Sequence, residues 1–169
     1  MKKKAIYLYV CWLTSAFGAL LSLWDLLAGK RLENPSEVMQ LKGEVAQQYN
    51  RFYDVVFDLN HSMSQALILF VGLLLLAAVL VLLIKKKLLL ANILYSAYSV
   101  FTILVIAYDY LSSQSLYHYF SDPAIRESIM MIPKAVTIVG LLLNILFLAI
   151  VLFYTWRQQK DLEVKKEPI

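Results

Sequence analysis

Four long apolar runs constrain this sequence more than any other feature. Each is longer than 20 residues, and an α-helix that rises about 1.5 Å per residue needs about 20 of them to cross the hydrocarbon core of a bilayer. We predict spans at residues 5–28, 64–84, 88–111 and 133–156. Because they use more than half of the 169 residues, no separate soluble domain fits into the remainder. The prediction is a single membrane domain, residues 1–169, folded as an all-α, four-helix antiparallel transmembrane bundle.

The charged residues predict how these spans are oriented. Ten of the sixteen Lys and Arg fall in the alternate segments 1–4, 85–87 and 157–169, which together carry a net charge of +7. The remainder of the chain, including the segments 29–63 and 112–132, carries a net charge of −3. Basic residues accumulate on the cytoplasmic side of a membrane. We therefore expect a multi-pass plasma-membrane protein with both termini in the cytoplasm and the two longer segments outside.

The same placement decides which partner the basic residues meet. The net charge of +4 is typical of a nucleic-acid-binding protein only when the basic residues share one exposed surface. Here they flank the apolar runs, where they fix topology and contact anionic lipid head groups. The bilayer is the expected partner, and nucleic acid is not.

The first outside segment predicts an amphipathic helix. Asn34-Pro35-Ser36-Glu37 reads as a helix start, with Asn34 as the N-cap and Glu37 closing a capping box. Apolar side chains then recur every three or four residues, which predicts one helix over Pro35–Leu59. Its apolar stripe contains Val38, Leu41, Val45, Tyr49, Phe52 and Val56. The membrane surface, the second outside segment or a partner protein must cover this stripe, and we take it as the partner-facing surface.

Short signals define the remaining elements. Ser62-Met63-Ser64-Gln65 is a second capping box, which opens the second span. Asp122-Pro123 starts a short helix that ends at Ile132, between the third and fourth spans. Pro133 then begins the fourth span, at a position where its missing N–H costs nothing.

Polar groups inside the spans indicate helix packing or function, because burying a polar group in lipid costs free energy. In the first span they follow spacings of three and four residues and fall within an arc of about 80°. This seam consists of Cys11, Ser15, Gly18, Ser22 and Asp25. Such seams usually let two helix backbones approach closely. The alternative is the lining of a hydrated path.

The third and fourth spans carry polar stripes of their own. The third holds Asn92, Ser96, Ser99, Thr102 and Asp109, and the fourth holds Thr137, Gly140 and Asn144. If the first, third and fourth spans face one another, these stripes form the bundle interior and the second span packs outside. The candidate binding or packing residues are Ser15, Gly18, Ser22, Asn92, Ser99, Thr102 and Asn144.

Asp25 and Asp109 are the only carboxylates within the predicted spans, and both fall near the outer boundary. Two carboxylates that share one proton are the machinery of aspartic proteases. A four-span chain of this kind resembles the lipoprotein signal peptidases in shape, but it lacks their N-x-x-D-R-like and F-N-x-A-D-like segments. Acids that reach head-group water from a helix end explain both positions more simply. They are remote catalytic candidates.

The sequence offers few residues for disulfide bonds, metal binding or phosphate binding. Cys11 is the only cysteine, so no disulfide forms within one chain. The two histidines, His61 and His118, lie outside the spans and have no zinc-ligand spacing. The five glycines are scattered and form no phosphate-binding loop. We therefore expect neither a cofactor nor a metal site.

Three classes of function are consistent with this sequence. The favoured class is a non-enzymatic accessory, scaffold or regulatory subunit of a membrane complex, whose partner is another membrane protein or a second copy of itself. The alternative is an oligomeric transporter or channel for small solutes or ions, which requires water-accessible Ser15, Ser22, Ser99 and Asn144. The third is a hydrolase that acts at the outer face through Asp25 and Asp109. The first is favoured because the chain offers contact faces but little reactive chemistry.

Overall fold

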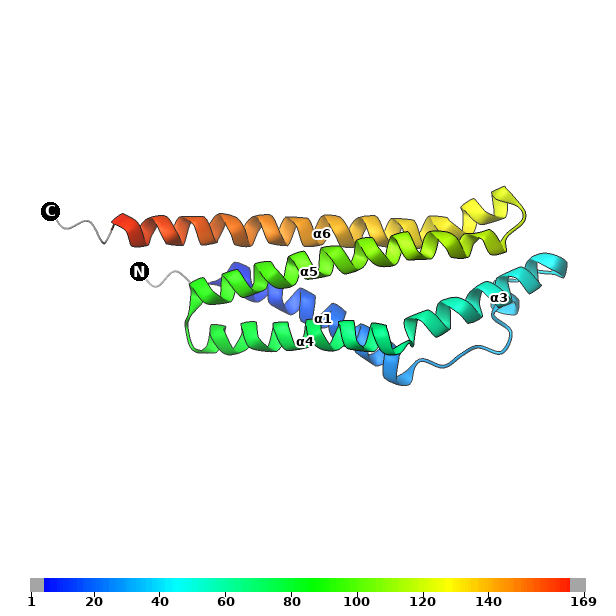
Figure 1. Cartoon of the computed structure of the whole chain (residues 1–169), viewed down its shortest axis with the longest axis horizontal. Helices are drawn as coiled ribbons and strands as arrows, with labels where there is room; N and C mark the ends of the chain where they lie inside the picture. The colour runs from blue at the N-terminus through cyan, green and yellow to red at the C-terminus, as the bar shows by residue number, and fades with distance from the viewer. Residues whose placement is uncertain (1–4, 165–169) are drawn as a thin grey trace.

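A computed structural model describes the backbone of residues 5–164 and the side chains of residues 5–160. The basic residues at 2–4 and 165–166 therefore lie outside the described part. All the regular elements of the described chain are helices (Figure 1). Four of them are long and apolar enough to cross a membrane: α1 (Ile6–Ala28), α4 (Met63–Ile84), α5 (Leu88–Gln114) and α6 (Pro123–Val164). The shorter elements are α2 (Pro35–Val38), α3 (Gly43–Asn60) and the 3₁₀ helix η1 (Ser115–Tyr119).

The long helices form an antiparallel array with two distinct ends. One end holds the turn at Lys85–Lys87, the start of α1 and the last turns of α6, and we call it the lysine end (Figure 1). The other end holds α2, α3 and η1, and we call it the α3 end. Helices α4, α5 and α6 run side by side, whereas α1 crosses them and moves away from α6 toward the α3 end (Figure 1).

The sequence predicted that the second span packs outside the other three spans, and this prediction is wrong. Helix α4 contacts both α1 and α5. The indole Nε1 of Trp12 on α1 donates a hydrogen bond to the carbonyl oxygen of Leu76 on α4, at 2.8 Å. Gly72 on α4 is buried, and the rings of Tyr98 and Phe101 on α5 lie beside it. Glycine at this position lets the aromatic rings of α5 approach, so that one face of α4 packs into the bundle while the other face stays exposed.

The buried core lies toward the lysine end. Its members come from all four long helices and include Leu8, Cys11, Leu76, Val79, Leu83, Ala91, Tyr95 and Val151. The four helices are therefore joined around this core, and toward the α3 end α1 and α4 move away from α5 and α6, which stay side by side (Figure 1).

The predicted single helix over Pro35–Leu59 is wrong. The chain forms α2 and α3 instead, separated by a turn in which Gln40 and Gly43 have φ angles of 55° and 64°. Positive φ is incompatible with a right-handed helix, and glycine adopts it without a steric penalty. The turn separates Val38 from the stripe on α3 and leaves its side chain 70% exposed.

The predicted capping box at Asn34 is also absent, because the Asn34 side chain makes no capping hydrogen bond. The backbone N–H of Ser36 instead donates to Oδ1 of Asn50 on α3, at 2.9 Å. This contact folds α2 back against α3. By contrast, Ser62 caps α4 as predicted and accepts a hydrogen bond from the backbone N–H of Gln65.

The short helix over 123–132 and the fourth span over 133–156 are not separate elements. They form the single helix α6 of 42 residues, with Pro133 inside it. Proline removes one backbone donor and crowds the carbonyl group four residues earlier, but α6, which packs along α5, continues through Pro133. At about 1.5 Å per residue α6 is about 63 Å long. It is therefore longer than the whole of a bilayer, which is about 40–45 Å thick with its head groups.

Candidate functional site

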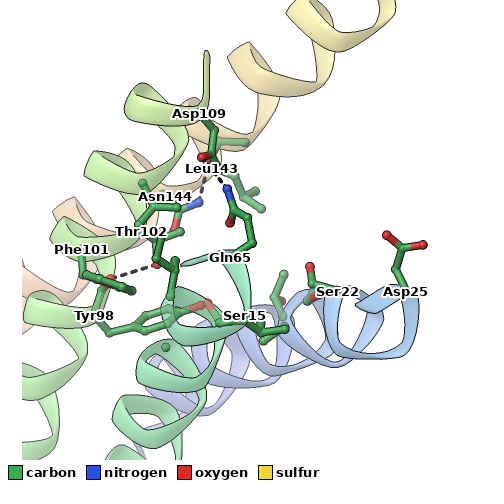
Figure 2. A pocket seen from close by; sticks show the side chains of 18 of the residues that line it. Ser15, Ser22, Asp25, Gln65, Tyr98, Phe101, Thr102, Asp109, Leu143 and Asn144 are labelled. Atoms are coloured by element: carbon green, nitrogen blue, oxygen red, sulfur yellow. Dashed lines mark hydrogen bonds between the residues drawn. The ribbon is translucent and has the colours of Figure 1, made fainter. Parts of the chain in front are cut away.

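A cavity of about 670 Å³ lies between α1, α4, α5 and α6. Its volume falls within the range of about 300–1,000 Å³ that is usual for small-molecule pockets. Four long helices contribute to its wall, and side chains from α1, α4, α5 and α6 surround the same space (Figure 2). The wall residues with polar side-chain groups are Thr14, Ser15, Ser22, Asp25, Asn60, Gln65, Tyr98, Thr102, Asp109 and Asn144.

The cavity occupies the half of the bundle nearer the α3 end. On α5 the lining runs from Tyr98 to Asp109, and on α6 it runs from Val136 to Phe147. Each stretch covers eleven helical steps, or about 16 Å. The carboxyl and amide groups of Asp25, Gln65 and Asp109 lie at the α3 end of the lining. The rings of Phe101 and Phe147 lie at its deep end. We call these two regions the mouth and the floor.

Buried side chains separate the floor from the lysine end. Tyr95 is fully buried, and its hydroxyl donates to the Cys11 carbonyl oxygen at 3.1 Å. A second hydrogen bond, of 2.8 Å, joins this hydroxyl to Ser15 Oγ. These contacts hold α1 against α5 directly below the cavity.

A polar triad closes the bundle further toward the lysine end. The Tyr7 hydroxyl donates to Asn92 Oδ1 at 2.9 Å, and Asn92 Nδ2 donates to Gln158 Oε1 at 3.3 Å. Gln158 Nε2 completes the ring at 3.4 Å from the Tyr7 oxygen. The Tyr7 ring is also stacked on Tyr154, with 3.8 Å between centroids. One side chain from each of α1, α5 and α6 is therefore tied into this triad.

The predicted candidate residues divide between these two regions. Ser15, Gly18, Ser22, Thr102 and Asn144 line the cavity. Asn92 is instead a fully buried member of the triad. Ser99 is also fully buried, and its hydroxyl has no hydrogen-bond partner in the described chain.

The two aspartates occupy different places at the mouth. Asp109 Oδ1 accepts a hydrogen bond of 2.9 Å from Gln65 Nε2, which ties α5 to α4. Asp25 is exposed at the end of α1, and its side chain lies apart from that of Asp109 (Figure 2). Among the described side chains no hydrogen bond joins the two carboxyl groups. Sharing a proton requires direct contact, so this arrangement does not supply the paired acids of an aspartic protease.

A histidine clasp, not foreseen in the sequence, fixes the mouth. The ring of His61 lies between two carbonyl oxygens, with Nδ1 2.9 Å from that of Phe57 and Nε2 3.2 Å from that of Asp25. Gly29 is packed against it, since a Cβ at Gly29 would lie 2.4 Å from the Asp25 oxygen and 2.8 Å from His61 Nε2. The clasp joins the end of α1 to the end of α3.

The apolar stripe of α3 is covered in its middle by η1 and the residues that follow it. The Phe52 ring lies 5.5 Å from the Tyr117 ring and 5.3 Å from the Phe120 ring, between centroids. The Gln48 side chain adds hydrogen bonds of 2.9 and 3.3 Å to Ser121. Burial raises the pKa of the Tyr49 phenol in the same stripe. At Phe52 the stripe is therefore covered by the same chain, and not by the membrane surface or a partner protein.

Two further observations concern metal binding and the ion pairs of Arg31. Across the described residues no group of three or more His, Cys, Asp and Glu could hold a metal ion. Arg31 forms ion pairs with Asp54, at 3.8 Å, and with Asp58, and its guanidinium lies 5.0 Å from the centroid of the Phe57 ring. Arg31 is thus already engaged by α3.

The four long apolar helices suggest a multi-pass membrane protein, here with a cavity between its helices. The family described as a domain of unknown function (DUF8777) matches residues 1–164, and the chain belongs to this family. No curated protein and no solved structure matches the chain.

Proposed function

We propose that this protein is a non-enzymatic accessory or regulatory subunit of a plasma-membrane complex, and that it responds to a small ligand bound in its cavity. The cavity carries the proposal. Its volume suits a small molecule, and its wall brings together the polar seams of α1, α5 and α6. Hydroxyl, amide and carboxyl groups above an aromatic floor are suited to binding, because they combine a few polar contacts with apolar area.

The charge distribution supports an orientation for this subunit. The positive-inside rule assigns the Lys85–Lys87 turn, and both termini with it, to the cytoplasm. The mouth of the cavity then opens on the outer side. In this orientation the core around Tyr95 lies between the ligand and the cytoplasm.

The partner surface that we propose lies outside the membrane, on α2 and the turn that follows it. Val38 is 70% exposed and Met39 is 50% exposed. The partner is another membrane protein or a second copy of the chain.

Site-specific photo-crosslinking tests the proposal. A photoreactive amino acid at Val38, in intact membranes, should capture a discrete adduct that mass spectrometry identifies. The matched control places the same group at Glu127, an exposed position on α6. If the protein is recovered as an uncrosslinked monomer from both variants, with native mass spectrometry agreeing, the accessory role is refuted.

A carrier is the second candidate, because the cavity is open at one end and a buried core closes the other. Carriers with alternating access occupy such one-sided states. In a Cys11→Ala background, cysteines at Ser22 and Asn144 should react with a water-soluble thiol reagent, since both positions line the cavity. A carrier further requires a cysteine at Asn92 to react from the lysine end. A fast reaction at Asn92 would favour transport, and an inert Asn92 would favour the accessory role.

A further inference from the structure

We propose that the cavity binds a single chain of an amphiphile whose head group is an ammonium that donates hydrogen bonds. The head group lies at the mouth, beside Asp25 and Asp109, and the chain lies over Phe101 and Phe147 on the floor. This inference rests on the proposed function, because it names the class of ligand that the subunit would sense.

The depth of the cavity matches one leaflet of a bilayer. The lining extends about 16 Å along α5 and α6, and the hydrocarbon core of a bilayer is about 30 Å thick. A molecule whose head stays at the surface therefore reaches the floor with a chain that crosses one leaflet. The wall carries its two carboxylates at the mouth and the rings of Phe101 and Phe147 at the floor, so its charge lies where the head group of such a molecule would lie.

Four hydroxyl groups of the wall already donate their hydrogens within the protein. Thr14, Ser22 and Thr102 donate to the carbonyl oxygens four residues earlier, at 3.0, 3.2 and 3.0 Å. The Ser15 hydroxyl is bonded to Tyr95. A hydroxyl with its hydrogen engaged can only accept a further hydrogen bond. These groups are therefore complementary to a donor.

The amide groups of the wall are partly engaged. Asn144 Nδ2 donates to the Gly140 carbonyl oxygen at 2.9 Å, and Gln65 Nε2 donates to Asp109. Each keeps a carbonyl oxygen that can accept and a second N–H that can donate (Figure 2). The amides therefore suit a ligand with both donors and acceptors, and the four engaged hydroxyl groups favour a donor.

The charge of the lining selects a cation. Asp25 and Asp109 are its two carboxylates, and none of the described residues that line it is Lys, Arg or His. A phosphate or sulfate head without an amine would lie beside two carboxylates with no cation in the lining. An ammonium supplies both the charge and the N–H groups, and hydrogen bonds between charged partners are about twice as strong as neutral ones.

Photoactivatable lipids in nanodiscs test this assignment. The probes carry the same diazirine-labelled chain and differ in the head group: phosphatidylethanolamine has an ammonium with N–H donors, phosphatidylcholine has a quaternary ammonium without them, and phosphatidylglycerol is anionic. A photoactivatable long-chain primary amine, compared with the matching alcohol, represents a source other than the bilayer phospholipid. Peptide mapping then measures adducts on the cavity-facing parts of α5 and α6.

We expect the ethanolamine lipid or the primary amine to label these peptides more than the other probes do, and the stronger of the two identifies the source. Asp109→Asn keeps the acceptor for Gln65 but removes the charge. It should lower this labelling about tenfold, the equivalent of one charged hydrogen bond. Glu127→Gln removes an exposed carboxylate outside the cavity and should change nothing.

A filled cavity provides the second variant. A Cβ at Gly18 would have no atom within 4 Å, so Gly18→Leu should occupy the cavity and abolish labelling without disturbing the backbone. Ala77→Leu adds the same bulk to an exposed position of α4 and should leave labelling unchanged. Equal labelling by all head groups, abolished by Gly18→Leu, would refute the ammonium assignment while leaving a ligand cavity. Absence of cavity labelling by every probe would also refute the assignment, and the crosslinking at Val38 would then decide the proposed function separately.

Discussion

Tyr95 performs two structural tasks with one side chain. Its ring fills the core at the lysine end of the cavity, and its hydroxyl bonds to both the Cys11 carbonyl oxygen and Ser15 on α1. Ser15 in turn contributes to the cavity wall. The position of α1 relative to the cavity therefore depends on the Tyr95 hydroxyl.

Removing that hydroxyl should loosen α1. We expect Tyr95→Phe to lower the free energy of unfolding by about 1–2 kcal/mol, because it leaves Ser15 without its partner. Thermal unfolding in detergent measures the change. Tyr108→Phe, at a position that is 64% exposed, is the control, and an equal shift in both variants would contradict the role of Tyr95.

Gly29 should tolerate no side chain. A Cβ there would lie 2.4 Å from the Asp25 carbonyl oxygen, and relieving such overpacking typically costs about 1–3 kcal/mol. We expect Gly29→Ala to destabilise the protein and to increase hydrogen exchange at the end of α1. Gly18→Ala, which meets open space inside α1, should cause neither effect, because alanine favours a helix more than glycine does. A stable Gly29→Ala variant would show that the clasp does not need this close approach.

At the scale of elements, the apolar pattern predicts the long helices well. The predicted spans at 5–28, 64–84 and 88–111 correspond to α1, α4 and α5 with small differences at their ends. Burial in lipid requires long uninterrupted apolar runs, so hydropathy alone locates these helices. The apolar pattern fails at two places. Positive φ at Gly43 interrupts a regular apolar stripe, and α6 continues through Pro133, where the sequence predicted a boundary between two helices.

The cavity was less predictable than the helices for a physical reason. The polar seam of α1 can be recognised from spacing, but only the crossing of α1 and α6 decides that it faces an open space and not a neighbouring helix. Gln65 was predicted as part of a cap, yet its side chain reaches Asp109 on another helix. Contacts of this kind depend on helix packing, which no local pattern encodes.

The contact between α3 and η1 can be tested through Phe52. We expect Phe52→Ala to reduce stability by about 1–3 kcal/mol, less than for a fully buried phenylalanine, because the ring is only half-buried. Hydrogen exchange should accelerate in α3 and η1 together, since the ring touches both Tyr117 and Phe120. Val38→Ala is the control. Unchanged protection of η1 would mean that α3 is held by other contacts.

At the scale of the whole molecule, the proposed orientation makes one simple prediction. Cysteines at Lys86 and Asp58, in a Cys11→Ala background, should react with an impermeant thiol reagent from opposite sides of the membrane. The proposed orientation puts Lys86 on the cytoplasmic side, because basic residues accumulate there. Reaction of both positions from the same side would refute the orientation.

The length and continuity of α6 have a consequence for signalling across the bilayer. Its cavity-lining stretch starts at Val136, beyond Pro133, and the helix continues without another proline to Val164. That portion is about 42 Å long at about 1.5 Å per residue. It can act as a stiff lever, because a straight helix transmits a tilt at one end directly to the other. A molecule that pushes on the wall near Gly140 would then displace the opposite tip of α6, and no separate hinge or relay would be needed to carry the message.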